Sequence, residues 1–417
     1  MIDLRRLREE AAYRAGVERK GASAETIEAV LSADVAARSA RQVTEELRAR
    51  SNGASKDIGR AAPEERQTRI DAAQGLKAEL QEAEVGLAAS DAALSEIALQ
   101  LPNAAHDSVP DGGEDDFRIE VEVGVQAPAP ALTHAEIGEK LGIVDTDRAV
   151  NMSGSRFAYL MGDAVLLQFA LVQWVMTKLV TKGFIPCIPP VLVREEMMVD
   201  AGFFPTDRHQ VYELERDGLF LVGTAEVGLA GLHRGDRLDA DRLPRRYVGY
   251  SSCFRREAGT YGKDTQGLFR VHQFDKVEMF IYAHPDRSWD EFELLRSIEE
   301  EIFTELEMPY RVITVAAGDL GNAAAKKYDI EVWLPSEQRY REVTSCSNYT
   351  DYSARRMGSR VKNDDGTEIL HTLNGTACAI GRTLLAIFEH HQLPDGTIAV
   401  PAVLRRFCGL DVVGPVR

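Results

Sequence analysis

A narrow apolar seam in residues 73–101 constrains the fold more than any other feature of this chain. Apolar residues recur there at spacings of three and four or whole heptads, at Ala73, Leu76, Leu80, Ala83, Leu87, Leu94, Ile97 and Leu101. A helix with this period buries one thin stripe against a partner helix. The segment that begins near Ala24 is rich in Ala, Glu, Arg and Leu and predicts that partner. We therefore expect two long antiparallel helices.

The first helix of this pair has a less regular pattern. Its expected seam residues are Ile27, Val30, Leu31, Val35, Val43 and Leu47. We expect a break between the helices from Asn52-Gly53 to Pro63, because Gly and Pro interrupt helices. The helical segment alone leaves a second interpretation open, a coiled coil that only joins copies of the chain.

A change in composition marks the expected domain boundaries. Residues 102–132 carry Pro, Gly and Asp in excess and predict a linker with a strand that leads into the next domain. We divide the chain into a helical arm (1–110), a linker (111–132) and a larger domain (133–417). The larger domain is expected to hold an apolar helix near 162–182 and strands near 217–223, 246–254, 268–281, 310–315 and 328–334. Several of these strands adjoin hairpin-like turns, which predicts an α+β fold with a largely antiparallel sheet.

Composition and charge limit the class of protein. The chain has 44% hydrophobic and 28% charged residues, and no apolar run reaches the roughly 20 residues that cross a bilayer. The N-terminal segment lacks the apolar core of a secretory signal, so we expect a cytoplasmic protein with no membrane partner. The net charge of −17 argues against broad attraction to nucleic acid but permits a local basic track. The five cysteines form no CxxC pair, and the chain has no G-x-x-x-x-G-K-[ST] phosphate loop.

Two short segments place polar groups beside apolar strands. In Gly223-Thr224-Ala225-Glu226 a hydroxyl and a carboxylate follow the strand LFLV, and capping of the strand end is the simpler interpretation. Residues 253–280 predict a hairpin whose strands present four side chains to a cleft: Arg255, Glu257, Phe274 and Glu278. The planar fork of Arg255 suits a phosphate or a carboxylate. A hairpin held by salt bridges is the alternative.

A third segment, residues 340–348, follows the strand IEVWLP. Strand alternation places Glu342, Thr344 and Cys346 on one face and Val343 and Ser345 on the other, unless a bulge intervenes. A buried polar ladder would explain this pattern equally well. Mg²⁺ prefers carboxylate and phosphate oxygens to thiolate, so we do not expect Cys346 to be a metal ligand.

A fourth segment, residues 373–392, predicts a strand, a turn at Asn374-Gly375 and an amphipathic helix that carries Arg382. The wording of the four segments, with FRREAG, GLFRVHQFDKVEM and TSCSN in this order, resembles class II aminoacyl-tRNA synthetases. It is similar specifically to the seryl-tRNA synthetases of the bacterial type, over nearly the whole chain. The resemblance implies a class II catalytic domain behind a tRNA-binding arm.

The reaction implied by the resemblance has two steps. ATP and L-serine form seryl-adenylate, and the seryl group then passes to the 3′ end of serine tRNA. Whether selenocysteine tRNA is also a substrate stays open. The implied enzyme is a ligase that requires Mg²⁺ and acts as a homodimer, joined through the first class II motif around Pro189 or Pro190.

The resemblance also implies a role for each site residue. Three residues are implied to be catalytic: Arg255, Glu278 and Arg382. The residues implied to bind serine are Thr224, Ala225, Glu226, Arg255, Glu278 and Thr376. The residues implied to bind ATP are Arg255, Arg256, Glu257, Phe274, Glu342, Val343, Thr344, Ser345 and Arg382. Glu342 and Ser345 are implied to hold Mg²⁺, Phe274 to stack on adenine and Arg382 to bind the γ-phosphate.

Some features depart from the family pattern. Gly228 stands where we expect proline, and Ala377-Cys378 replaces Gly-Leu or Ala-Leu. Lys263 and Gln266 lie in a loop where the family often has arginines. Residues 1–110 carry 15 basic against 19 acidic residues, so tRNA binding requires basic residues gathered on one face of the arm, such as Arg38, Arg41, Arg48, Arg69 and Lys77. Two alternatives remain: a paralogue that activates serine for another acceptor or as an inhibitor-resistant copy, and a non-catalytic protein that kept the fold.

Overall fold

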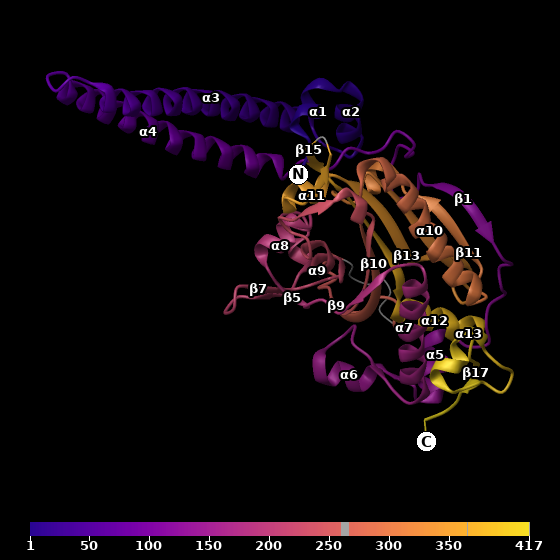
Figure 1. Ribbon diagram of the computed structural model, residues 1–417. Coiled ribbons are helices and arrows are strands. Elements are labelled where there is room, and N and C mark those ends of the chain that lie inside the picture. The colour runs from indigo at the N-terminus through magenta and orange to yellow at the C-terminus, as the bar shows by residue number, and fades with distance from the viewer. Residues whose placement is uncertain (260–266, 365, 417) are drawn as a thin grey trace. The chain divides into compact units, whose positions relative to one another are not determined.

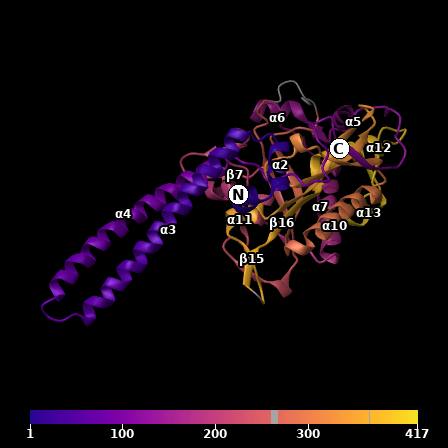
Figure 2. The same cartoon turned by 90° about the horizontal axis from the view of Figure 1, so that it is seen from above.

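The computed structural model (Figure 1) describes residues 1–259, 267–364 and 366–416. The chain forms two compact units, residues 1–104 and 105–417. The first unit contains four helices: α1 (Leu4–Glu9), α2 (Ala11–Arg19), α3 (Ala24–Arg60) and α4 (Arg66–Ala98). Figure 2 shows α3 and α4 as a long antiparallel pair, as the apolar period predicts. α3 begins at Ser23, whose hydroxyl accepts a hydrogen bond from the Thr26 N–H at 3.1 Å.

The expected end of the first long helix is wrong. α3 continues through Asn52-Gly53 to Arg60, and the connection to α4 occupies only residues 61–65. A glycine in an exposed helix costs about 1 kcal/mol relative to alanine. Such a cost does not interrupt a 37-residue helix that packs against a partner along its length.

The expected seam of α3 is correct only in part. Val35 and Val43 are 56% and 48% exposed, whereas Asp34, Ala37 and Thr44 are buried. Heptad spacing from Val30 selects residues 37 and 44, so position along the helix decides burial more than side-chain polarity. The buried polar groups are satisfied: Asp34 accepts from Arg8 at 2.6 Å, and the Thr44 hydroxyl donates to the Ala40 carbonyl at 2.8 Å.

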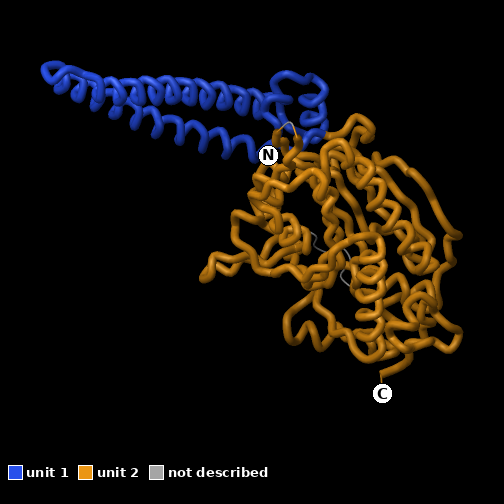
Figure 3. The backbone as a smooth tube through the Cα atoms, in the orientation of Figure 1, with its two compact units in different colours: residues 1–104 blue, residues 105–417 orange. Residues whose placement is uncertain are grey.

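The second unit, orange in Figure 3, is built on an eight-stranded sheet. Across the sheet the strands are β1 (Arg118–Val123), β11 (Tyr310–Thr314), β12 (Lys326–Leu334), β13 (Arg339–Thr350), β16 (His371–Ala379), β10 (Gln273–Ala283), β9 (Arg245–Phe254) and β4 (Ile185–Cys187). Every neighbouring pair is antiparallel except β4 with β9. The α+β fold with a largely antiparallel sheet is therefore confirmed. β1, from the segment expected as a linker, forms one edge of the sheet.

Shorter strands pair outside this sheet. They are β2 (Val144–Asp145) with β3 (Tyr159–Leu160), β5 (Leu192–Arg194) with β7 (Leu219–Leu221) and β6 (Glu213–Leu214), β8 (Arg237–Asp239) with β14 (Arg360–Asn363) and β15 (Gly366–Ile369), and β17 (Ile398–Ala399) with β18 (Val412–Val413). The helices of this unit are α5 (His134–Leu141), α6 (Thr146–Ser153), α7 (Asp163–Thr181), α8 (Glu195–Asp200), α9 (Glu226–Gly231), α10 (Ser288–Glu305), α11 (Tyr352–Met357), α12 (Ile380–His390) and α13 (Ala402–Cys408).

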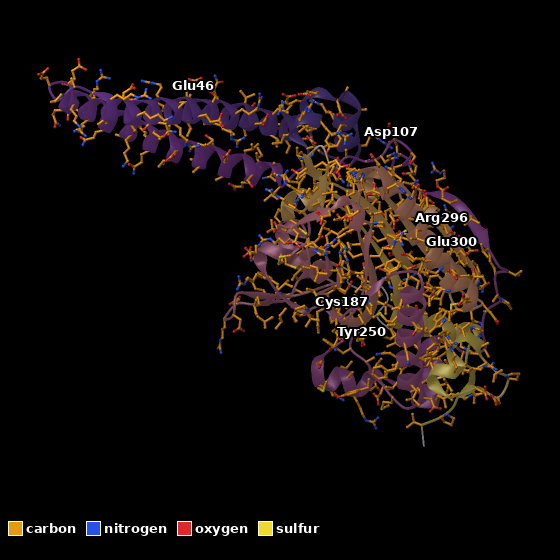
Figure 4. The ribbon with its side chains drawn as sticks, in the orientation of Figure 1. Glu46, Asp107, Cys187, Tyr250, Arg296 and Glu300 are labelled. Carbon is orange, nitrogen blue, oxygen red and sulfur yellow. The ribbon has the colours of Figure 1, made fainter. Side chains whose placement is uncertain are left out.

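The two faces of the sheet have different chemistry. On β10, Val277, Met279 and Ile281 are fully buried in one apolar core with residues of α7, α10 and α12. Lys276 and Glu278, the neighbours of Val277 along the strand, face the other side, as strand alternation requires. α10 covers the apolar face, and its outer surface carries the ion pair of Arg296 with Glu300 at 2.9 Å (Figure 4).

α7 is a core helix with one side left open. By length and composition alone it is the one described helix that passes as a candidate membrane span. Its inner side, with Leu167, Leu171 and Trp174, is buried in the same core as the sheet. This arrangement is typical of a long apolar helix in a globular domain.

The expected turn at Asn374-Gly375 is also wrong. β16 runs without interruption from His371 to Ala379. Gly375 lies opposite Cys346 of β13, and a Cβ at this glycine would lie 2.9 Å from Oε1 of Glu299 on α10. The glycine therefore permits a close approach of helix and sheet, and Asn374 stays in the strand.

Candidate active site

A cavity of about 410 Å³ opens on the polar face of the sheet. Eleven of the residues implied by the resemblance line it: Thr224, Glu226, Arg255, Glu257, Phe274, Glu342, Val343, Thr344, Ser345, Thr376 and Arg382. They come from α9, β9, β10, β13, β16 and α12 and from the ends of these elements, so segments far apart in the sequence converge.

The other three implied site residues do not line the cavity. Ala225 is buried at the start of α9, and Glu278 is buried beneath the cavity. Arg256 lies outside the lining, where its guanidinium is 5.6 Å from the centre of the Tyr212 ring. Lys263 and Gln266 lie outside the described residues.

The floor of the cavity is a hydrogen-bonded network around Glu278. Thr376 donates from its hydroxyl to Glu278 Oε2 at 3.1 Å, and Asn374 donates from Nδ2 to Oε1 at 3.0 Å. The ammonium of Lys276 lies 2.7 Å from Oε2. A fully buried carboxylate is stable in this position because it has a cation and two donors around it.

Glu226 lies beside this network and is linked to it by the same amide. Asn374 Nδ2 also donates to Glu226 Oε2, at 3.0 Å. Burial, followed by the nearby charge of Glu278, raises the pKa of Glu226 to about 7, although a hydrogen bond with Tyr349 and the charges of Lys276 and Arg255 act in the opposite direction. The Thr224 hydroxyl accepts from the Glu226 N–H at 3.2 Å. This end of the cavity is therefore a small acidic recess with a hydroxyl at its edge, which suits an ammonium group and a short polar side chain.

Arg255 lies at the mouth of the cavity, just after β9. Its Nε donates to the Gly223 carbonyl at 3.2 Å, and its guanidinium lies 5.3 Å from the centre of the Phe274 ring. Glu257 has a φ of +50° and accepts from Arg270 Nη1 at 2.6 Å. A non-glycine residue with positive φ is strained, and such strain is found often at functional sites.

The opposite wall combines Glu342 with cations. Arg382 Nη1 donates to the Glu342 carbonyl at 2.8 Å and lies 3.5 Å from its carboxylate. Burial alone would raise the pKa of Glu342, but the charges of Lys327 and Arg382 lower it well below its ordinary value. Arg382 is suited to hold a phosphate, and the ionised carboxylate beside it is suited to hold a metal ion bound to that phosphate.

A β-bulge decides which residues of β13 face the cavity. Ile330 of β12 pairs with Thr344 and Glu331 pairs with Glu342, so Val343 is the extra residue. Glu342 and Ser345 therefore share the cavity side. Simple alternation would have placed them on opposite faces, and only a bulge allows this exception. Thr344 lies close to Glu299 of α10, beneath the sheet.

Sequence reasoning missed part of the lining. Lys276, Asn374, Lys327 and Tyr349 all line the cavity. Alternation along β10 from Glu278 would have found Lys276, and alternation from Ser345 would have found Tyr349. Asn374 was not expected in the lining because the Asn-Gly pair predicted a turn at this position.

Gly228 has a clear structural setting. It lies in α9, and a Cβ at this position would lie 2.6 Å from Cβ of Pro189. The space that a side chain would need is filled by Pro189, so the glycine allows tight packing between α9 and the segment after β4.

Comparisons with known proteins agree with this architecture. Residues 210–391 match the family described as tRNA synthetase class II core domain (G, H, P, S and T), and residues 1–105 match the seryl-tRNA synthetase N-terminal domain. The serine–tRNA ligase of Nocardia farcinica is 47% identical over 419 residues and that of Acidothermus cellulolyticus 46% over 420, each with 100% of both chains covered.

Solved structures give the same result. The crystal structure of seryl-tRNA synthetase from Pyrococcus horikoshii complexed with ATP has a TM-score of 0.91 and 36% identity, with 100% of both chains covered. The cytoplasmic serine–tRNA ligase of Naegleria fowleri in complex with AMP has a TM-score of 0.87 and 30% identity. The chain belongs to the seryl-tRNA synthetase family of class II aminoacyl-tRNA synthetases and is a serine–tRNA ligase.

Proposed function

We propose that the cavity binds L-serine in the acidic recess and ATP along the wall that carries the arginines. The observation that carries this division is the hydrogen bond from Thr376 to Glu278 beneath the recess. A serine hydroxyl that joins this pair replaces water with matched donors and acceptors, whereas alanine would leave the buried groups unpaired. The serine ammonium would meet Glu226, and Arg255 would hold the carboxylate.

ATP is proposed to lie between Phe274 and Arg382. Phe274 offers a ring for adenine, Glu257 offers an acceptor for the adenine amino group, and Arg382 offers a cation for the terminal phosphate. Arg255 lies between the two substrates and would neutralise charge that develops as the serine carboxylate attacks the α-phosphate. The seryl-tRNA synthetase of P. horikoshii, crystallised with ATP, supports ATP as the nucleotide.

Glu342 and Ser345 are proposed to hold Mg²⁺ between phosphate oxygens. Both lie on the cavity side of β13, and their oxygen atoms are of the type that Mg²⁺ prefers. No group of three or more His, Cys, Asp or Glu side chains in the described parts of the chain is placed to hold a metal alone. This fits an ion that is bound mainly through the nucleotide, and it would supply charge neutralisation at the phosphates.

A homodimer is proposed from the open side of α7 and the segment after β4. Apolar side chains exposed there include Leu166, Phe169, Val180, Ile185 and Ile188, with Ile188 79% exposed. A second copy of the chain would cover them, as the first class II motif implies. Phe169→Asp is expected to give a monomer in sedimentation, and a variant that stays dimeric would contradict this surface.

The arm is proposed to bind the tRNA, although its arginines have acidic neighbours. Arg41 pairs with Asp91 at 3.0 Å and Arg48 with Glu84 at 2.8 Å, and each pair joins α3 to α4. Such half-exposed pairs are weak, so a phosphate can compete for the guanidinium. Reversing Arg41 and Arg48 to Glu should raise KM for tRNA without changing KM for serine; an unchanged KM for tRNA would refute this role.

The full reaction is tested by a paired assay on the purified chain. Serine-dependent exchange of pyrophosphate into ATP reports adenylate formation, and charging of serine tRNA with labelled serine reports transfer. Both activities are expected. Exchange without charging would favour the paralogue with another acceptor. We propose a cytoplasmic location, which fits five cysteines that are all free thiols.

A further inference from the structure

Phe269 lies at the phosphate end of the cavity beneath two arginines. The guanidinium carbon of Arg382 is 4.7 Å from the centre of the Phe269 ring, and that of Arg341 is 3.8 Å from it. The ring is only 8% exposed and belongs to the main apolar core. An aromatic ring at this distance attracts a cation through the negative charge of its face.

The backbone around Phe269 reinforces this contact. The Phe269 carbonyl accepts a long hydrogen bond from Arg382 Nε at 3.5 Å. A Cβ at Gly381, the residue before Arg382, would lie 3.4 Å from the Leu268 carbonyl. The segment 268–269 therefore packs directly against the first turn of α12, which carries Arg382.

Each of the two arginines that contact the ring also has an acidic neighbour. Arg341 Nη1 donates to Glu337 Oε2 at 2.5 Å, and Arg382 has Glu342 as its acidic neighbour. Each guanidinium thus has both a carboxylate and the ring as neighbours. This arrangement limits their mutual repulsion and leaves both arginines with a defined position.

We propose that Phe269 is a positioning residue that holds the Arg382 guanidinium at the ATP phosphates before the nucleotide binds. The proposal rests on the role of Arg382 given above. A free arginine side chain samples many rotamers, and it loses this conformational entropy when it binds phosphate in a single rotamer. A guanidinium already held by the ring and by Glu342 loses less freedom, so binding is tighter. Leucine would keep an apolar side chain in the core but has no aromatic face to attract the cation.

The test compares Phe269→Leu with Phe269→Tyr in serine-dependent pyrophosphate exchange on the full chain. Phe269→Leu is expected to raise KM for ATP by about 3- to 30-fold, the range of a partly desolvated cation–π contact. KM for serine should stay unchanged, and Phe269→Tyr, which keeps the ring, should keep a KM for ATP near that of the wild type. Phe303→Leu is the matched control, because Phe303 is fully buried in the same core and no cation lies over its ring among the described residues.

The control separates positioning from packing. Phe303→Leu is expected to lower the thermal midpoint without raising KM for ATP. The proposal is overturned if Phe269→Leu keeps the wild-type KM for ATP, if it raises both KM values together, or if Phe269→Tyr fails to preserve the wild-type value.

A double-mutant cycle ties the effect to Arg382. In an Arg382→Met background, Phe269→Leu should have little further effect on KM for ATP, because the partner is gone. Arg382→Met itself must raise this KM strongly. An unchanged KM for ATP in Arg382→Met would overturn the role of Arg382, and the positioning role of Phe269 with it.

Discussion

Glu226 gives a quantitative test of the acidic recess. It is 4% exposed, close to Glu278, and linked to that carboxylate through the single amide nitrogen of Asn374. Burial, followed by the charge of Glu278, raises its pKa from the ordinary value of 4.5 to about 7. Glu226→Gln keeps an acceptor for Asn374 and removes the ionisable group.

The effect of Glu226 ionisation on the free energy of unfolding follows from the difference between its pKa in the folded and the unfolded chain. Well below pH 4.5 the carboxyl is protonated in both the folded and the unfolded chain, and its titration does not change the stability. Between pH 4.5 and 7 the unfolded chain loses the proton while the folded chain keeps it, so stability falls by about 1.4 kcal/mol per pH unit. Above pH 7 the loss is complete, at ~3 kcal/mol. In the absence of serine, Glu226→Gln is therefore expected to be more stable than the wild type at pH 8 by up to that amount.

The assay is urea unfolding of both proteins at pH 5, 6, 7 and 8 without substrates. The difference in the free energy of unfolding between variant and wild type should rise from pH 5 to pH 7 and then level off. Glu215→Gln, at an exposed position, is the control and should show no such rise. A difference that does not change with pH, or a variant less stable than the wild type at pH 8, would refute the reasoning.

Three further changes test the site and its support. Thr376→Val removes the donor to Glu278, so KM for serine should rise by about 10- to 100-fold in pyrophosphate exchange while KM for ATP stays constant. Gly375→Ala places a Cβ 2.9 Å from Glu299 Oε1 and should lower the free energy of unfolding by about 1–3 kcal/mol in urea. Burial raises the pKa of Glu299 well above its ordinary value, so Glu299→Gln should gain stability over the wild type as pH rises from 5 to 8; an equal gain at every pH would contradict this cause.

The regular parts of the fold were accessible from the sequence because they repeat. The seam of α4 follows a period of three and four residues, and the positions from Ala73 to Ile97 that the period selects are the partly buried ones. The antiparallel sheet follows from strands that adjoin hairpin turns. Convergence of distant segments on one cavity came from the family resemblance, since no local pattern reports which strands become neighbours.

The errors occur where tertiary contacts override local preference. Asn374-Gly375 is a strong turn signal, but here the glycine serves the close approach of α10 to the sheet. Thr44 and Asp34 lie in the apolar seam of the arm because hydrogen bonds to other helices satisfy them. The extra residue Val343 has no sequence signature, although it determines that Glu342 faces the cavity.

The surroundings of Glu226 explain why its pKa is raised. Lys276 lies 2.7 Å from Glu278 and balances its charge, whereas Glu226 accepts from the amide of Asn374, and the charges of Lys276 and Arg255 lower its pKa less than burial and the charge of Glu278 raise it. Burial beside the charge of Glu278 therefore favours the protonated form of Glu226. In the proposed binding mode, a serine ammonium in the recess would bring a positive charge to Glu226 and favour loss of its proton. The proposed recognition of the amino group then depends on Lys276 as well as on the carboxylates, because Lys276 already balances the charge of Glu278 and leaves Glu226 to meet the ammonium.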